Sequence, residues 1–274
     1  MALKKTDKSW SKKYFSFGHR LPSILANPLF GDRKRFGLEI QENDHDWQEW
    51  QKFYMQFYQN TQKSGIGKKV NDAGYEILSQ IDLSGKHVLE VGPGALPHYR
   101  YWNGKPAKYT VVDVKQVFLD QSLQILNQEG VIFSSCLTSA DSLPFDDGSI
   151  DIIISFYSLE HMYPLDTFLK EFNRILRPNG FLIGAIPCEG GLAWGLGRFF
   201  TSRRYIKKYS KINPDKIYCW EHPNFADQIL HSMDKYFTQT KIQYWPLRIP
   251  FIDMNLIARF IYTKIELWHN DTSF

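Results

Sequence analysis

The stretch VLEVGPGA, residues 88–95, decides the fold. A short apolar segment, typical of a buried strand, ends near the acidic Glu90 and turns at once on two glycines, Gly92 and Gly94. Glycine permits positive φ angles and lets the backbone approach a ligand closely. A strand followed directly by such a turn predicts a ligand-binding loop early in an α/β sheet.

Downstream of this loop, strand-like apolar segments alternate with amphipathic helical segments. The contiguous Ile152–Ile154 indicates a strand that is buried on both faces, as in a parallel sheet. The order of elements predicts a Rossmann-like, doubly wound, mostly parallel seven-stranded sheet with an antiparallel edge hairpin. We expect strands at 87–91, 109–113, 131–134, 150–156, 181–186, 238–245 and 256–264, and helices at 68–81, 117–128, 165–176 and 225–233.

Two segments lie outside this regular alternation. Residues 1–64 are interpreted as an N-terminal extension or cap, in which 1–42 looks basic and irregular. Residues 65–274 then form the main domain, interrupted after the fifth strand by an irregular insertion at 188–222 that covers the substrate. An aromatic stripe at helical spacing in the extension predicts a helix that packs on the main domain, serves as a lid, or does both: Trp47, Trp50, Phe53, Tyr54, Phe57 and Tyr58.

A second acidic residue narrows the class of ligand. Asp113 ends the next predicted strand 19 positions after Gly94, where a carboxylate can hold ribose hydroxyls. The full GxGxxG pattern of dinucleotide enzymes is absent, because Ala95, Leu96 and Pro97 follow Gly94. A P-loop is excluded because no GK[ST] follows the glycines.

Four stretches in this order resemble the class I S-adenosylmethionine-dependent methyltransferases. The likeness is to the group near the ubiquinone/menaquinone-biosynthesis (type 11) enzymes. The stretches are LEVGPG (89–94), TVVDV (110–114), ADSLPFDDGSIDIIISFYSLEHM (140–162) and FLKEFNRILRPNGFLIGAIP (168–187). The resemblance covers about residues 85–187 and implies that the chain is a transferase with S-adenosyl-L-methionine as its cofactor.

The resemblance also implies roles for individual residues at the cofactor. Glu90, Gly92 and Gly94 would shape the pocket at the methionine end of the cofactor. Asp113 would hold the ribose, unless it serves only to cap the next helix. The family often has a third glycine where Leu96 stands here, so the loop departs from the family pattern at this position.

The adenine end and the methyl group would meet later segments of the chain. By the same resemblance, Asp141 would contact the adenine amino group, with Ser142 beside it. Phe156 would line the end of the fourth strand that faces the methyl group.

Methyl transfer from a sulfonium needs alignment of the acceptor, and a hydroxyl acceptor also gains from a base. His161, His222 and Glu221 are the predicted catalytic residues, with Glu160 and His98 as further candidates. Either histidine can equally be a hydrogen-bonded structural residue. No cluster of residues suggests a metal site, so none is predicted.

The acceptor is predicted less sharply than the donor. Aromatic and basic residues mixed in 188–222 favour O-methylation of a sugar or glycan, whereas a quinone-like small aromatic acceptor is the alternative. A non-catalytic module that binds S-adenosylmethionine is the alternative of another class.

The composition of the chain limits which binding partners and which cellular compartment are predicted. The net charge of +4 is too small to predict nucleic acid. Basic groups at Lys4–Lys13 and Arg198–Lys211 are interpreted as solvated surface or as sites for phosphate or peripheral contact with an anionic membrane. Three scattered cysteines and the lack of a signal peptide or long apolar run favour a cytoplasmic protein. The oligomeric state is left open.

Overall fold

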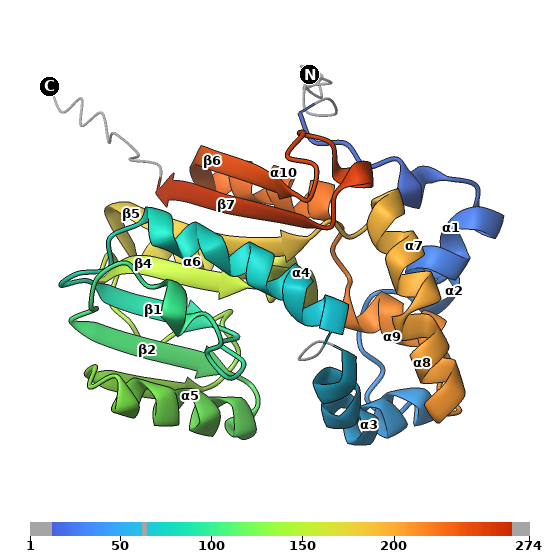
Figure 1. The fold of residues 1–274 in the computed structure, drawn as a ribbon, viewed down its shortest axis with the longest axis horizontal. Helices are drawn as coiled ribbons and strands as arrows, with labels where there is room; N and C mark the ends of the chain where they lie inside the picture. Colours follow the sequence, from blue (N-terminus) through green and yellow to red (C-terminus); the bar gives the residue numbers. More distant parts are fainter. Residues whose placement is uncertain (1–12, 62–64, 265–274) are drawn as a thin grey trace, which may run out of the picture.

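A seven-stranded mixed sheet forms the centre of the structure, a computed structural model that describes residues 13–61 and 65–264 (Figure 1). The strand order is β3-β2-β1-β4-β5-β7-β6, with β7 antiparallel to both of its neighbours and the other pairs parallel. This topology confirms the predicted sheet and its edge hairpin. The strands are β1 (His87–Val91), β2 (Lys108–Asp113), β3 (Phe133–Leu137), β4 (Ile150–Phe156), β5 (Leu176–Pro187), β6 (Phe237–Trp245) and β7 (Ile257–Lys264).

Helices cover both faces of this sheet. On one face lie α4 (Gly65–Tyr75), the 3-10 helix η3 (Glu76–Gln80) and α5 (Gln116–Gln128). On the other lie α6 (Leu165–Ile175) and α10 (Ala226–Tyr236). Each face therefore has its own apolar core, which confirms the doubly wound arrangement.

The isoleucine run of β4 joins the two cores. Because side chains alternate along a strand, Ile152 and Ile154 enter the core under α4 and α5, while Ile153 enters the core under α6 and α10. All three are buried, and burying such a side chain stabilises a fold by roughly 1.5–3 kcal/mol. The predicted burial of this strand on both faces is confirmed.

Several predicted boundaries shift. The third strand is Phe133–Leu137 rather than 131–134. The first helix of the domain leaves α-helical geometry after Tyr75 and continues as η3 to Gln80. The fifth strand begins at Leu176 rather than at 181, because Leu176 pairs with Ile150 of β4. The register of the pairing then shifts between Ile150 and Ile152.

The expectation that 1–42 and 188–222 are irregular was wrong for the residues that the structure describes, 13–42 and 188–222. The first holds α1 (Ser23–Phe30) and α2 (Arg33–Phe36), and the second holds three helices, α7 (Leu192–Phe200), α8 (Ser202–Tyr209) and α9 (Pro214–Glu221). One glycine of α7, Gly195, serves the packing of this helix. A Cβ at Gly195 would lie 2.6 Å from the Phe30 ring, so glycine is what lets α1 and α7 approach closely.

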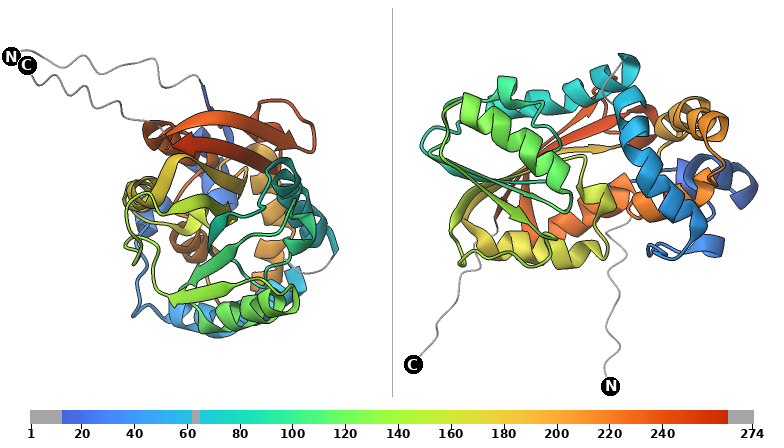
Figure 2. Two further views of the ribbon diagram at one scale, coloured as in Figure 1. Left: turned by 90° about the vertical axis from the view of Figure 1, so that its left-hand side faces the viewer. Right: turned by 90° about the horizontal axis from the view of Figure 1, so that it is seen from below.

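The extension and the insertion form one cap at the carboxyl ends of the parallel strands (Figures 1 and 2). In α3 (His45–Thr61), Trp47, Trp50 and Phe57 pack against Trp220 of α9 and Ile206 of α8. The stripe thus packs as predicted, although mainly on the insertion. In the described residues, no helix has the length and apolarity needed to cross a bilayer. Of the first basic group, Lys4 to Lys12 lie outside the described residues.

Candidate functional site

The glycine loop after β1 leaves little room for a Cβ atom at its two glycine positions. Gly92 and Gly94 take φ angles of +69° and +57°. A Cβ on Gly92 would lie 2.9 Å from the Ser158 Cβ, and one on Gly94 would lie 3.1 Å from the Tyr58 hydroxyl. Leu96, which replaces a family glycine, is buried and adopts φ +50°. The loop therefore keeps a left-handed backbone at this position without the glycine.

Glu90 lies behind this loop. Its side chain is 0% exposed and accepts a hydrogen bond from the Tyr109 hydroxyl at 2.6 Å. The His98 Nε2 lies 3.1 Å from the second carboxylate oxygen. Since His98 belongs to the segment that leaves the glycine loop, Glu90 holds that segment against the sheet. Its predicted place at the methionine end remains a prediction.

The adenine and ribose candidates gather beside the glycine loop. Asp113 ends β2 and accepts the backbone N–H of Lys115 at 2.8 Å. It is not the N-cap of the next helix, as the alternative interpretation held, because that position belongs to Lys115. The Thr138 N–H donates to the Asp113 carbonyl at 3.1 Å, which starts the loop that carries Asp141 and Ser142 next to Asp113. Both of these side chains are exposed.

One apolar residue stands out among these candidates. Val114 is 67% exposed although it directly follows the buried strand β2. An exposed valine beside a carboxylate offers a flat apolar contact and a hydrogen-bond acceptor together, which suits a nucleoside. The sequence did not single out this residue.

Two tyrosines of α3 cover the site from the cap. Tyr58 lies over Gly94, and burial together with the negative charge of Asp113 raises the pKa of Tyr58 to about 12. Tyr54 stacks with Tyr58 at 6.0 Å, and the Lys115 ammonium lies 3.6 Å from the centre of the Tyr54 ring. The packing role of the stripe is thus confirmed, and its role as a lid stays a prediction, to which the position of Tyr58 over Gly94 is suited.

An acid–base pair sits beneath this lid. The His161 Nδ1 donates to the Glu221 backbone carbonyl and lies 3.4 Å from the Glu221 carboxylate. Trp50 Nε1 donates to the same carboxylate at 2.6 Å. Burial by itself lowers the pKa of His161. The hydrogen bond to Glu221 and the negative charges of Glu160 and Glu221 outweigh burial and raise this pKa to about 9.

A second imidazole adjoins the first. The rings of His161 and His222 lie 4.7 Å apart. The His222 Nδ1 is 3.3 Å from Glu189, a buried carboxylate that Arg198 of α7 holds through two hydrogen bonds. Burial and the positive charge of Arg198 lower the pKa of His222 to about 4. At neutral pH the structure thus places a neutral His222 beside a protonated His161.

The remaining base candidates differ in position. Glu160 is 2% exposed, lies near His161 and Glu189, and has its pKa raised to about 7 by burial. His98 is buried on the far side of the glycine loop, between Glu90 and Phe156. Phe156 is itself buried at the end of β4, where it also contacts Tyr75. The structure therefore unites His161, His222, Glu221 and Glu160, and separates His98 from them.

Lys115, Glu189 and Arg198 were not predicted as site residues. Glu189 follows the end of β5 by two residues, a position that in a parallel sheet points to a ligand crevice. That signal was present in the sequence. Lys115 gave no such signal, because its nearness to Glu221 arises only from contacts between the cap and the sheet.

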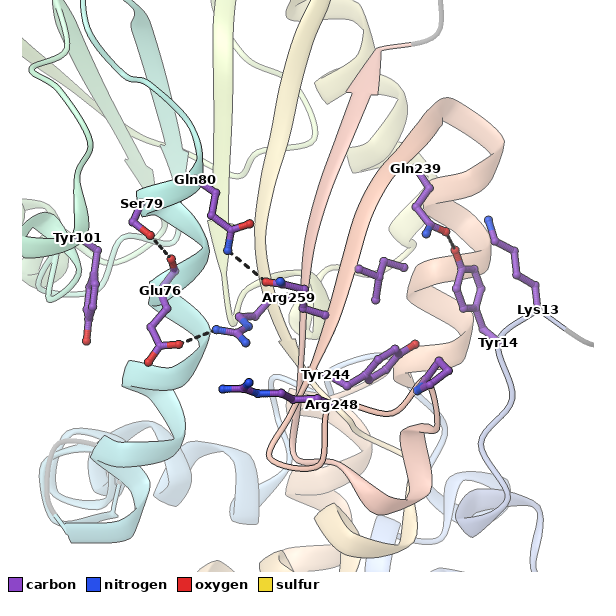
Figure 3. A pocket seen from close by; sticks show the side chains of 13 residues that line it. Lys13, Tyr14, Glu76, Ser79, Gln80, Tyr101, Gln239, Tyr244, Arg248 and Arg259 are labelled. Carbon is purple, nitrogen blue, oxygen red and sulfur yellow. Dashed lines mark hydrogen bonds and ion pairs between the residues drawn. The ribbon is translucent and has the colours of Figure 1, made fainter.

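A separate hollow of about 830 Å³ lies along the β6–β7 hairpin and η3 (Figure 3). Several of its polar side chains pair with one another, since Arg259 donates to Glu76 at 2.7 Å and Gln80 to Gln243 at 3.2 Å. None of the candidate site residues lines it. We therefore interpret it as a surface groove along the edge strand.

Comparison with known proteins identifies the central segment. Residues 89–184 match the family model of a methyltransferase domain, which confirms the resemblance drawn from the sequence. A solved S-adenosylmethionine-dependent methyltransferase from Aquifex aeolicus shares the fold, with a TM-score of 0.52 and 14% identity over 77% of this chain and 98% of that one.

Two curated relatives bear names that refer to lipids. The chain is 36% identical over 125 residues to the probable phthiotriol/phenolphthiotriol dimycocerosates methyltransferase 2 of Mycobacterium ulcerans, covering 44% of this chain and 47% of the relative. It is 30% identical over 163 residues to the fatty-acid O-methyltransferase of Mycolicibacterium smegmatis, covering 58% and 51%. The chain thus spans about half the length of these relatives.

Proposed function

We propose that this chain, whose residues 89–184 form a methyltransferase domain, transfers the methyl group of S-adenosylmethionine to an oxygen atom of a lipid-like acceptor. One observation carries the proposal. The glycine loop, Asp113 and the exposed Val114 lie at the carboxyl end of the sheet, where the adjoining rings of His161 and His222 also lie, 4.7 Å apart. A candidate donor site and a candidate acid–base site thus share one end of the sheet.

The residues present fit such a cofactor. Gly94 leaves open backbone that any Cβ would fill, Asp113 offers a carboxylate for hydroxyl groups, and Val114 offers an apolar surface for a base. We assign Glu90 and Gly92 to the support of this cradle, and Asp141 and Ser142 to the adenine end. When bound, the cofactor supplies a sulfonium methyl group that is open to attack by a nucleophile.

The acceptor is assigned from the relatives and from the cap. The names of both curated relatives refer to lipids, and none of the relatives described above is named for a glycan. The predicted sugar acceptor therefore remains a prediction without support from them. The cap is rich in aromatic side chains, such as Trp50 and Trp194, and an aromatic-rich cover suits an acyl chain as well as a sugar. We treat residues 1–64 and 188–222 as the cover of this acceptor.

His222 is the base in this proposal. With its Nδ1 proton directed at Glu189, its Nε2 carries the lone pair that receives the proton of an acceptor hydroxyl as the new C–O bond forms. His161, held by Glu221, stays protonated and keeps the crevice positive near the acceptor oxygen. Glu189 and Arg198 position His222.

A carboxylate acceptor is the second candidate. Such an acceptor needs no base, and the cations Lys115 and His161 suit its charge. The name of one relative, a fatty-acid O-methyltransferase, favours it.

The test is transfer of a labelled methyl group from S-adenosylmethionine to extractable lipid. Purified protein is incubated with a long-chain alcohol, a long-chain fatty acid, a quinol or a soluble glycan. We expect label in the alcohol ether or the fatty-acid ester. Label found only in the glycan or in the quinol would overturn the lipid assignment, and binding of the donor without any turnover would indicate a non-catalytic module.

A further inference from the structure

Two segments of the cap and the loop between β6 and β7 meet around the buried carboxylate of Asp253. Asp253, 3% exposed, accepts the backbone N–H groups of Phe17 at 2.6 Å, Gly18 at 2.8 Å and Leu192 at 3.1 Å. These contacts join the segment before α1, the start of α7 and the loop between β6 and β7. The His19 N–H also donates to the Gly190 carbonyl at 2.8 Å. The backbones of the three segments therefore lie side by side at this point (Figure 1).

Large apolar side chains of these segments remain in solvent. Ile24 of α1 is 82% exposed and its neighbour Leu25 is 55% exposed. Leu196 and Phe200 are also exposed, one turn apart on α7, as are Phe251 and Met254 in the loop. Exposed apolar patches on this scale mark interaction sites, because isolated surface residues are common but adjoining ones are not.

Apart from the buried Asp253, the charged side chains of these three segments are all basic. Residues 13–31, 190–213 and 246–252 contain no Asp or Glu, although the chain has 29 acidic residues. They do contain exposed basic residues, among them Arg204, Lys207 and Lys208 on α8 and Arg248 in the loop. Apolar side chains flanked by Lys and Arg, with no acidic residue, complement the anionic headgroups and acyl chains of a bilayer surface.

Helix α7 links this surface to the acceptor site. Trp194 and Arg198, one turn apart, both donate to Glu189 inside the cap. Leu196 and Phe200 are offset from them by two residues, so they project from the opposite side of the helix, where they are exposed. A single helix thus contacts Glu189 on one side and carries exposed apolar side chains on the other.

We propose that this surface, formed by segments 13–31, 190–213 and 246–254, docks the protein on a bilayer that contains anionic phospholipid. The inference extends the proposed function, since a lipid acceptor would reach the crevice from the surface on which the protein lies. Docking itself requires neither donor nor acceptor. It is therefore tested independently of methyl transfer.

The experiment measures sedimentation of the purified protein with vesicles, in the absence of any cofactor. Vesicles of phosphatidylglycerol and phosphatidylcholine in equal parts are compared with vesicles of phosphatidylcholine alone. We expect binding to the anionic vesicles that weakens as salt is added, because headgroup attraction is screened. The double variant Ile24→Gln/Phe200→Gln should lower that binding by about tenfold, since two apolar contacts are lost.

The matched control is Ile132→Gln. Ile132 is 72% exposed but precedes β3, on an edge of the sheet away from the cap. It should bind vesicles like the wild type. Absence of binding to anionic vesicles at low salt, or equal loss in the control, would overturn the proposal. So would a double variant that keeps vesicle binding but changes the sedimentation mass of the protein, because the surface would then be an interface between copies of the chain.

Discussion

Gly94→Val is expected to remove cofactor binding while leaving the fold in place. The residue adopts φ +57°, and a Cβ there would lie 3.1 Å from the Tyr58 hydroxyl, in the space that the ligand needs. The clash and the lost close approach should cost about 3 kcal/mol or more, which corresponds to a loss of affinity of about 100-fold. Calorimetric titration with S-adenosylmethionine measures this loss.

A control variant distinguishes the effect of backbone strain from that of the steric clash with the ligand. Gly85 also adopts a positive φ, +70°, but its Cβ would meet nothing within 4 Å, and it precedes β1 at the opposite end of the strand. Gly85→Val should therefore lose stability from the same backbone strain and still bind the cofactor normally. Normal affinity in a folded Gly94→Val protein would refute the assignment of the loop.

His222→Ala is expected to abolish most turnover with a hydroxyl acceptor. A positioned general base contributes about 10²–10⁴-fold, so kcat should fall by at least 100-fold while cofactor affinity stays unchanged. With a carboxylate acceptor the same variant should keep most of its activity, because no proton is removed. His231→Ala, on α10, is the control and should behave like the wild type.

The two imidazoles also predict the pH dependence of that reaction. His222 has its pKa lowered to about 4, so it is neutral and able to accept a proton above that pH. His161 has its pKa raised to about 9, so it loses its charge above that pH. Turnover with a hydroxyl should thus rise through pH 4 and fall through pH 9. Full turnover in both His161→Ala and His222→Ala would exclude either histidine as the base.

Local patterns carried most of the core prediction. The Ile152–Ile154 run and the helical spacing of Leu165, Leu169 and Phe172 each depend on neighbours in the sequence, so periodicity located them correctly. The glycine loop was located for the same reason. Strand ends shifted by a few residues because pairing partners, such as Ile150 for Leu176, decide where a strand begins.

The cap could not be predicted in the same way. Helix α7 contains Gly195 and Gly197, which have low helix propensity, and the helix forms nonetheless within the packed cap, where Gly195 lies against Phe30. Likewise, the contact of His222 with Glu189 and the approach of Lys115 to Glu221 join residues that are distant in the sequence. Such contacts follow from the tertiary arrangement and leave no periodic signal.

Thermal unfolding of the wild-type protein in the presence of ligands tests the central claim most directly. A ligand that binds only the folded state stabilises it by about 2.7 kcal/mol at 100 times its dissociation constant. We predict that S-adenosylmethionine and its demethylated product raise the melting temperature with saturating concentration dependence, while NAD leaves it unchanged. A shift with NAD alone, or none with either methyl-donor ligand, would contradict the account.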